Sequence, residues 1–315
     1  TIYFLCFNSI FQYFIGYDIF GNQIHPSLRV SGILGEELIL GNIIFKLYVF
    51  FIFFYTCNKK KIFSFVLIFL STFIVIFLSG ERTSFVYFIL FNTLIIFFIK
   101  EYRSIFVKYT IPFMILILIL LLSFFPNHKE RFIDNTISQL FNTNKTTLSN
   151  QEYYIYSPNH EALIKTSIEI FKDNIFFGAG PKTFRYHCSD PKYMKQVEYW
   201  NIQKENIMKV DGCSSHPHNA YIQLMAETGL FGFTIIFSIF LYVLVNLIKI
   251  KKSDIGMQKS YESNIIVLCA LFIIVFPFLP TGNFFNNYSS AYIFFIFGLY
   301  LFTFKKLTKL RKIIK

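Results

Sequence analysis

The chain alternates long apolar runs with short polar or basic connections. About eight runs are apolar enough to cross a bilayer as helices, the form in which a backbone satisfies its own hydrogen bonds inside hydrocarbon. They lie at roughly 1–15, 38–56, 62–79, 85–99, 109–125, 230–248, 263–281 and 289–304. The pattern predicts an all-α polytopic membrane protein with about eight transmembrane helices. Because Thr1 already lies in an apolar run, we expect further spans upstream in the natural protein.

Basic residues follow every second run. They are Lys59, Lys60 and Lys61, then Lys100, Arg103 and Lys108, then Lys249, Lys251, Lys252 and Lys259, and in the tail Lys305, Lys306, Lys309, Arg311, Lys312 and Lys315. Cytoplasmic connections of membrane proteins carry an excess of lysine and arginine, so these clusters predict the cytoplasmic side. The opposite side then receives residues 17–37, 80–84, 126–229 and 280–288.

This topology divides the chain into three expected domains. Residues 1–125 form an N-terminal bundle of five spans, 126–229 form a loop domain, and 230–315 form three spans and a basic tail. The loop domain is too long for a simple connection. Within it, the apolar positions of 160–172 recur at helical spacing, which predicts a helix that can lie on the membrane surface.

Composition agrees with a membrane protein: 54% of the residues are hydrophobic and 21% aromatic. The formal net charge of +12 would favour a nucleic-acid partner in a soluble protein. Here the excess lies in the cytoplasmic connections, whereas basic and acidic residues balance in the loop domain. We therefore interpret the charge as a topology signal and expect a lipid bilayer, not nucleic acid, as partner.

Two cysteines, Cys188 and Cys213, lie in the loop domain on the side expected to be non-cytoplasmic. A pair there is free to oxidise, so we predict a disulfide that closes the intervening loop. The alternatives are free thiols, or a zinc site formed with His187 and His216. No close pair of cysteines or histidines has the spacing of a zinc site, so we expect no metal.

Three basic residues remain outside the loop domain and the cytoplasmic clusters: Arg29, Lys46 and Arg82. Guanidinium groups at a bilayer surface bind phosphate through two oxygens at once, which predicts a lipid diphosphate site. Lys46, inside the second span, is a further candidate. The alternatives are that Arg82 pairs with Glu81 or a lipid headgroup, that Arg29 is solvated, and that Lys46 reaches toward the interface.

The sequence His216-Pro217-His218-Asn219 precedes the apolar run that starts at Leu230. Proline disfavours helical geometry in the residue before it, so we expect a helix to begin at His218 or Asn219. A neutral imidazole at the edge of the bilayer can act as a general base. The alternative is that His218 only caps the helix and His216 is a loop residue.

Four short motifs occur in order on the predicted outer side: Arg29-Val30-Ser31-Gly32, Gly80-Glu81-Arg82-Thr83-Ser84, Asp173-Asn174-Ile175-Phe176-Phe177-Gly178-Ala179-Gly180, and His218-Asn219-Ala220-Tyr221 followed by Glu227-Thr228-Gly229. With them the chain resembles the O-antigen ligase and O-antigen polymerase family. Its members are glycosyltransferases of the GT-C type in the bacterial inner membrane. The resemblance implies transfer of a glycan from undecaprenyl diphosphate, in the periplasm and without metal or cofactor, to a hydroxyl of lipid A core or of a growing polysaccharide.

The resemblance also implies roles for residues. His218 matches a histidine that activates the acceptor, Arg82 matches an arginine that holds the diphosphate, and Arg29 matches a further recurrent arginine. Where the family often has an arginine at the start of the loop helix, this chain has His160, so the phosphate contact is expected to pass to Arg185 or Lys182. Further possible loop contacts are His160, His216, Asn219 and Tyr221.

Two other functions remain open from the residues alone. Transporters and flippases of lipid-linked sugars show internal repeats and charges near the midplane of the membrane. This chain shows no repeat, and most of its charge on the outer side lies in the loop domain, so we disfavour this function. A non-catalytic scaffold that binds glycan would use the aromatic residues of the loop domain, which an enzyme would use equally. These residues are Tyr153, Tyr154, Tyr156, Tyr193, Tyr199 and Trp200.

Overall fold

The computed structural model describes residues 1–58, 62–134, 136–137, 154–201, 206–250 and 258–314. It is mostly helical and divides into two compact units. Unit 1 comprises Thr1–Phe132, Val245–Ile274 and Ile296–Lys315, and unit 2 comprises Ile133–Leu244 and Val275–Phe295. Compared with the three domains expected from the sequence, residues 275–295 belong with the loop domain and not with the C-terminal spans.

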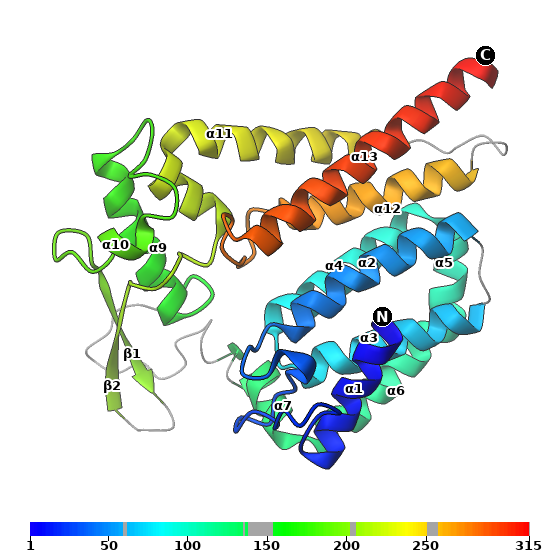
Figure 1. The fold of residues 1–315 in the computed structure, drawn as a ribbon, viewed down its shortest axis with the longest axis horizontal. Coiled ribbons are helices and arrows are strands. Elements are labelled where there is room, and N and C mark those ends of the chain that lie inside the picture. The colour runs from blue at the N-terminus through cyan, green and yellow to red at the C-terminus, as the bar shows by residue number, and fades with distance from the viewer. Residues whose placement is uncertain (59–61, 135, 138–153, 202–205, 251–257, 315) are drawn as a thin grey trace. The chain divides into compact units, whose positions relative to one another are not determined.

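Unit 1 is a helical bundle (Figure 1). It contains α1 (Ile2–Ile15), η1 (Gly32–Leu34), α2 (Leu40–Asn58), α3 (Ile62–Leu78), α4 (Arg82–Phe98), α5 (Lys100–Ile105), η2 (Phe106–Thr110), α6 (Ile111–Phe124), α7 (Pro126–Lys129), most of η3 (Glu130–Asp134), the end of α11 (Ala220–Ile248), α12 (Gln258–Ile274) and most of α13 (Asn287–Ile314). The α3 helix packs against α1 and α2, and α12 packs against α2 and α4. The η2 segment is one π-helical turn that joins α5 to α6.

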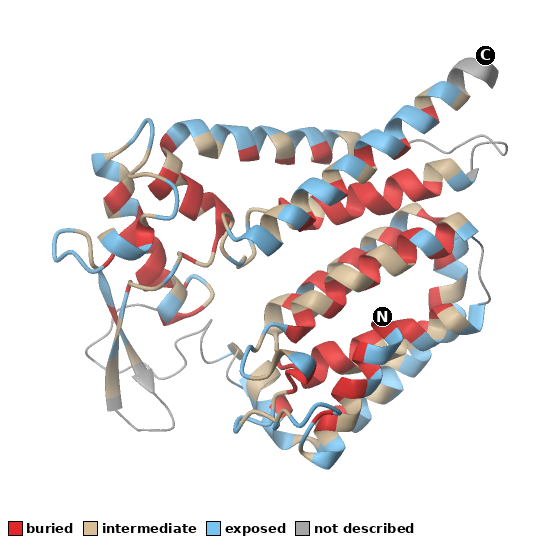
Figure 2. Cartoon of the chain, in the orientation of Figure 1, coloured by how far each residue is buried: buried red, intermediate tan, exposed pale blue. Residues whose placement is uncertain are grey.

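Aromatic rings fill the core of this bundle. The ring of Phe69 lies 5.1 Å from both Phe88 and Phe106, and Tyr48 lies 5.0 Å from Phe88, measured between ring centroids. All four side chains are buried, and Figure 2 shows buried stretches along the helices of this bundle. The hydroxyl of Tyr48 donates to Oδ1 of Asn92 at 2.7 Å, which satisfies the one polar atom of this cluster. Ring contacts of this kind therefore explain much of the high phenylalanine content.

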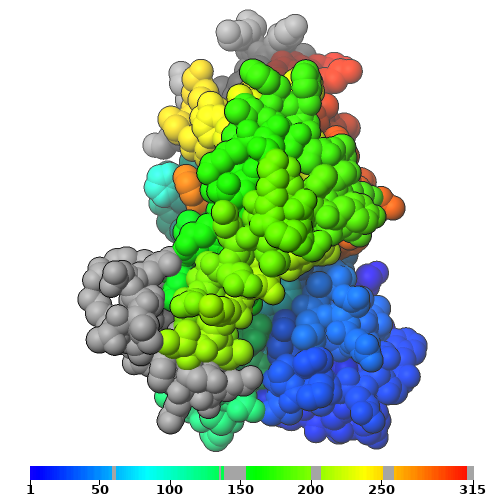
Figure 3. Space-filling view, turned by 90° about the vertical axis from the view of Figure 1, so that its left-hand side faces the viewer, coloured from blue at the N-terminus to red at the C-terminus, as the bar shows by residue number. Residues whose placement is uncertain are grey.

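Unit 2 has its own core and a small sheet. It contains α9 (Pro158–Asp173), α10 (Phe184–His187), the antiparallel strands β1 (Gln196–Asn201) and β2 (Asn206–Asp211), most of α11 (Ala220–Ile248) and the start of α13 (Asn287–Ile314). The green residues of this unit form a continuous surface in Figure 3. The all-α expectation missed the hairpin, which packs on α9.

The apolar side of α9 packs inside unit 2. Leu163 and Ile170 are 4% and 1% exposed, and they pack with Phe184, Cys188 and Ala226 in the core of unit 2. The loop domain thus uses this side of the helix for its own core, and the expectation that the helix can lie on the membrane surface stays a prediction. Gly212 allows a close approach to the same helix: a Cβ there would lie 2.1 Å from Oγ1 of Thr166.

Four helices of the described chain are long and apolar enough to span a bilayer, so the protein is a membrane protein. They cover Leu40–Asn58, Lys100–Phe124, Ala220–Ile248 and Asn287–Leu310, and the shorter apolar helices are Ile2–Ile15, Ile62–Leu78 and Arg82–Phe98. The span expected at 263–281 differs most from the structure. Its helix, α12, ends at Ile274, three residues before Pro277, and the chain continues without regular structure to the start of α13.

Some residues considered in the sequence lie outside the described part of the chain. They are Lys59, Lys60, Lys61, Lys251, Lys252, Lys315 and Tyr153, together with the side chains of Trp200, Arg311 and Lys312.

Candidate functional site

Two arginines lie over the turn that joins α3 to α4. Nε of Arg29 donates to the carbonyl oxygen of Ser79 at 2.7 Å, and Nε of Arg131 donates to that of Gly80 at 2.7 Å. Gly80 has a φ of 65°, and a Cβ at this position would lie 3.0 Å from each Nε. Glycine is therefore required here both for the left-handed turn and for the close approach of two guanidinium groups.

The loop that carries Arg29 is held by α1. Oε1 of the buried Gln12 accepts hydrogen bonds from the backbone N–H groups of Ser31 and Gly32, at 3.0 and 2.8 Å. The N–H of Val30 donates to the carbonyl of Leu78, the last residue of α3. Two different elements thus fix the position of Arg29, which argues against a solvated loop residue.

Glu81 caps a helix. Its carboxylate accepts from the N–H groups of Gly41 and Asn42, at 2.6 and 3.2 Å, and from the hydroxyl of Ser84 at 2.9 Å. Gly41 and Asn42 lie in the first turn of α2, where N–H groups have no partner within the helix. Lys46, also on α2, is half-buried and interacts electrostatically with Glu81. The carboxylate oxygens of Glu81 are therefore used at the start of α2.

Arg29, Arg82 and Arg131, here called the arginine cluster, concentrate positive charge at this end of unit 1. All three are half-buried. Burial, followed by the charge of Arg131, lowers the pKa of Arg29 to about 10, and the charge of Arg82 acts in the same direction. Glu81 opposes this shift only in part. At neutral pH the cluster stays cationic, so a bound anion would relieve its mutual repulsion.

Arg131 is the member that sequence reasoning missed. It lies in η3, within the polar segment that follows α6. The available signal was an arginine a few residues beyond the outer end of an apolar run, as Arg82 is beyond α3.

His128 lies near the arginine cluster. Its Nε2 is 3.0 Å from the carbonyl oxygen of Leu78, and burial lowers the pKa of its ring, so it acts as a neutral donor.

In unit 2, His218 ends the connection that leads into α11. Its φ is 56°, a left-handed conformation, and the helix begins at Ala220, two residues later than His218. Asn219 is the cap: its Oδ1 accepts from the N–H groups of Tyr221 and Ile222 at 3.0 and 3.1 Å. The expected start at His218 or Asn219 is thus displaced because asparagine, not histidine, supplies the capping oxygen.

Three histidines gather at this corner. The ring centroid of His218 lies 4.1 Å from that of His216 and 5.7 Å from that of His160, a residue of the first turn of α9. Burial lowers the pKa of His218, and burial together with His218 lowers the pKa of His216 to about 4. His160, His216 and His218, here called the histidine cluster, thus include two rings that are neutral at pH 7.

Ring nitrogens of the cluster differ in their partners. Nδ1 of His160 lies 2.7 Å from the hydroxyl of Ser157, and Nδ1 of His216 lies 3.0 Å from the hydroxyl of Ser215. The ring of His216 also forms a hydrogen bond with the backbone of Thr281, which partly opposes the lowering of its pKa by burial.

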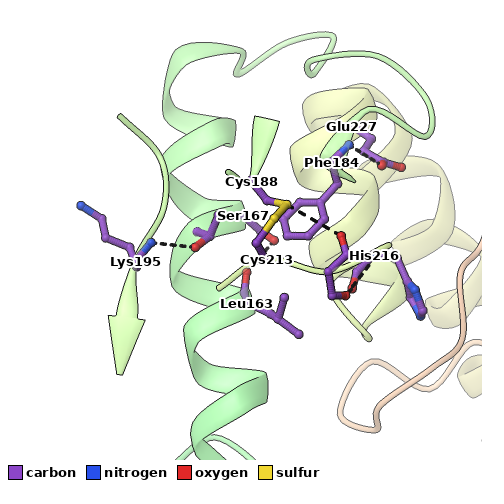
Figure 4. The surroundings of a disulfide bond; sticks show 10 residues. Leu163, Ser167, Phe184, Cys188, Lys195, Cys213, His216 and Glu227 are labelled. Atoms are coloured by element: carbon purple, nitrogen blue, oxygen red, sulfur yellow. Dashed lines mark hydrogen bonds between the residues drawn. A yellow bond between two sulfur atoms is a disulfide. The ribbon is translucent and has the colours of Figure 1, made fainter. Parts of the chain in front are cut away.

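A disulfide joins Cys188 to Cys213 in the structure, with their Cα atoms 4.9 Å apart. Figure 4 shows it beside Leu163 and Phe184, with the side chain of His216 directed away from it. Because Cys213 lies three residues before His216, the bridge ties the histidine corner to the end of α10. Among the described residues, no group of histidine, cysteine or acidic side chains could hold a metal ion.

Asn219 and Tyr221, expected as possible loop contacts, use their polar atoms on the backbone of the connection after α12. Nδ2 of Asn219 donates to the carbonyl oxygens of Pro277 and Leu279, and the hydroxyl of Tyr221 donates to that of Val275. In return the carbonyl oxygen of His218 accepts from the N–H of Thr281 at 2.7 Å. These bonds explain why residues 275–295 belong to unit 2.

Two glycine motifs of unit 2 cross each other. A Cβ on Gly178 would lie 2.3 Å from the backbone of Glu227, and a Cβ on Gly229 would lie 2.4 Å from the backbone of Phe176. Gly229, with a φ of 65°, also breaks α11 into two parts. The buried carboxylate of Glu227 accepts from the N–H of Phe184 at 2.9 Å, as Figure 4 shows. This crossing holds the break of α11 against the turn that follows α9.

Arg185 lines an open pocket in unit 2. The pocket has a volume of about 230 Å³ and is formed by Lys182, Arg185, Asn283, Phe285, Asn286 and Asn287. Two cationic side chains and three amides supply donors for an anionic, hydroxyl-rich ligand such as a phosphorylated or acidic sugar. Arg185 and Lys182 therefore lie together, in a different unit from Arg29, Arg82 and Lys46.

Each cluster by itself has chemistry that group transfer uses. The arginine cluster can stabilise a departing diphosphate, and a neutral imidazole can accept the proton of an attacking hydroxyl. A family model described as O-Antigen ligase matches residues 63–237, which is more than half of the chain. No curated protein and no solved structure matches the chain. The matched region includes Arg82, Arg131 and the whole histidine cluster, and the chain belongs to the O-antigen ligase family.

Proposed function

We propose that this protein transfers a glycan from undecaprenyl diphosphate to a hydroxyl of lipid A core or of a growing polysaccharide, at the periplasmic face of the bacterial inner membrane. The acceptor oxygen attacks the anomeric carbon and the bond from that carbon to the diphosphate oxygen breaks. His218 takes the proton of the hydroxyl, and undecaprenyl diphosphate leaves with the electron pair of the broken bond. No metal or cofactor takes part in this proposal.

The arginine cluster is the observation that carries the proposal. Three half-buried guanidinium groups share one end of unit 1, while the neighbouring carboxylate of Glu81 caps α2. Keeping like charges together costs free energy, and a diphosphate whose negative charge grows in the transition state is the anion that would offset this cost most. We assign Arg29, Arg82 and Arg131 to the diphosphate, with Lys46 as a further contact.

In unit 2 we assign His218 as the general base, with His216 and His160 beside it. Asn219 and Tyr221 position His218 through their hydrogen bonds to the backbone of residues 275–279. Arg185, with Lys182, is proposed to contact a phosphate or another acidic group of a substrate.

Glycan transfer in a strain that lacks its own ligase or polymerase tests the proposal. The full-length protein, His218→Ala and Arg82→Ala are produced at matched levels in the membrane, with His187→Ala and Lys129→Ala as controls. We expect the wild type and both controls to produce long glycan on lipid A core or on the undecaprenyl carrier, and the two site variants to produce none. Full activity of both site variants would refute the residue assignment.

The same strains distinguish a second outcome. If removal of the protein causes the lipid-linked glycan to accumulate on the cytoplasmic side, the protein moves glycan across the membrane and the transfer proposal is wrong. A wild-type protein that binds glycan but restores neither product would indicate a scaffold.

A further inference from the structure

The turn between α9 and α10 exposes three consecutive apolar side chains. Ile175, Phe176 and Phe177 are 44%, 70% and 80% exposed. The turn itself is ordered, because the N–H of Gly178 donates to the carbonyl oxygen of Asn174 at 2.9 Å. Adjacent large apolar side chains on an ordered surface mark a site of contact with a membrane or another molecule.

Backbone hydrogen bonds fix this turn beside α11. The N–H of Leu230 donates to the carbonyl oxygen of Ile175 at 2.8 Å, and that of Phe231 donates to the carbonyl oxygen of Phe176 at 3.3 Å. Leu230 and Phe231 are themselves 40% and 64% exposed. The five residues, here called the apolar tip, form one patch at the break of α11.

The apolar tip is continuous with a membrane-spanning segment. After the break at Gly229, the remaining part of α11 runs from Leu230 to Ile248, about 28 Å at a rise of about 1.5 Å per residue. The hydrocarbon core of a bilayer is about 30 Å thick, so this part fits it and begins at its edge. Backbone pairing puts Ile175 and Phe176 beside the first turn of that part, at the same depth.

Charged residues border the tip. Lys172, exposed at the end of α9, pairs with Glu169, and Lys192 pairs with Asp173. Apolar side chains at the hydrocarbon edge with basic side chains next to them are typical of segments that lie in a membrane interface. Bilayer lipid is therefore the occupant that agrees with both the position and the surroundings of the tip.

We propose that the apolar tip inserts into the bilayer leaflet on the side of unit 2, so that Phe176 and Phe177 anchor the loop domain in the membrane. The anchor also limits how far the histidine cluster can lie from the membrane surface. From Gly229 to Ala220 the first part of α11 is at most about 15 Å long, so His218 lies close to the headgroup region. The proposal does not depend on which reaction the protein catalyses.

Tryptophan fluorescence can test this contact, because the chain has a single tryptophan, Trp200. In a background in which Trp200 and any tryptophan of the full-length protein outside these 315 residues are replaced by phenylalanine, Phe177→Trp places the probe in the tip. Tyr186→Trp places a matched probe at an aromatic position in α10 that is 74% exposed. Both full-length proteins are reconstituted in phosphatidylcholine vesicles, with and without bromine atoms on the acyl chains.

We expect brominated lipid to remove most of the emission of the Phe177→Trp variant and to leave that of the Tyr186→Trp variant nearly unchanged. If the Phe177→Trp variant shows emission typical of water that is not quenched, the proposal is overturned. Emission typical of an apolar site without quenching would overturn the proposal as well. The tip would then be covered by protein, either by a second copy or by another part of the chain.

A Phe176→Trp variant in the same background repeats the measurement should Phe177→Trp fail to fold. Folding of each variant is checked by its thermal unfolding in the same vesicles. Phe176→Trp must show the same loss of emission in brominated lipid, since its backbone is bonded directly to Phe231.

Discussion

The arginine cluster of unit 1 and the histidine cluster of unit 2 use burial in opposite ways. In the arginine cluster, half-buried side chains keep their charge, because even a pKa lowered to about 10 lies well above neutral pH. In the histidine cluster, burial removes charge, because the pKa of His218 and of His216 falls below the usual value near 6.5. The same physical effect thus leaves a lasting cation in one cluster and a neutral imidazole in the other.

The two clusters also differ in how they are held. Backbone carbonyl groups at the end of α3 and in the following turn anchor the side chains of Arg29 and Arg131 directly. His218 is positioned through its backbone, which Asn219 and Thr281 fix. We therefore expect the arginine cluster to depend on single side chains, and the histidine cluster to depend on the scaffold as well.

Replacing His218 should have the largest effect. His218→Ala removes the proposed base, and a positioned general base contributes about 10²- to 10⁴-fold to a rate. We expect a loss of this size in glycan transfer by purified protein in lipid nanodiscs, with His187→Ala unchanged. A loss of less than about tenfold would remove His218 from the role of base.

The close backbone contacts at Gly178 and Gly229, here called the glycine crossing, should be disrupted by one added methyl group. Gly229→Ala places a Cβ 2.4 Å from the backbone of Phe176 at a φ of 65°. Strain and overpacking together should lower the free energy of unfolding of unit 2 by about 2–4 kcal/mol. Denaturant unfolding, followed by loss of protection of the Cys188–Cys213 disulfide from reductant, measures it. Gly298→Ala is the control, because a Cβ there meets nothing within 4 Å; equal stability of the two variants would contradict the crossing.

Both clusters show where sequence reasoning succeeds and where it fails. The order of apolar runs, the helix near 160–172 and the family could all be predicted, because helix periodicity and short motifs are local properties. Arg131, the hairpin and the end of α12 could not. The place of Arg131 in the cluster follows from its hydrogen bond to Gly80, which lies 51 positions earlier in the sequence. The segment after α12 is irregular because Asn219 and Tyr221 bind its backbone.

Asn219 and Tyr221 show the same limit from the other side. They were expected as possible loop contacts, and in the structure Nδ2 of Asn219 and the hydroxyl of Tyr221 donate to the backbone of residues 275–279. A sequence shows that a residue is polar and near a motif, but not which backbone will take its hydrogen bonds.

Arg131 tests whether the arginine cluster acts as a unit. Arg131→Ala removes one of three positive charges, and we expect glycan transfer to fall by about 10- to 100-fold, less than for His218→Ala. Arg131→Lys keeps the charge but loses the donation from Nε to Gly80, so its activity should lie between that of Arg131→Ala and wild type. Lys129→Ala, an exposed cation two residues away, is the control. Equal activity of Arg131→Ala and wild type would exclude Arg131 from the site.

The dependence of the transfer rate on pH should distinguish the two clusters, and we expect this effect to be the smallest of those predicted. Transfer needs neutral His218, whose lowered pKa keeps it unprotonated at pH 7, so the rate should stay level down to about pH 6.5 and fall only below it. The arginine cluster should keep its charge until the pH approaches about 10, the pKa of Arg29.

The stability of the protein should also depend on pH, through His216. Between about pH 6.5 and 4 the unfolded chain binds a proton that His216 in the folded protein does not, so stability should decrease as the pH falls through this window. His216→Gln should weaken that decrease, measured by thermal unfolding against pH, while the acid limb of the rate remains. If the variant instead removes the acid limb of the rate, His216 is the proton acceptor and the assignment of His218 fails.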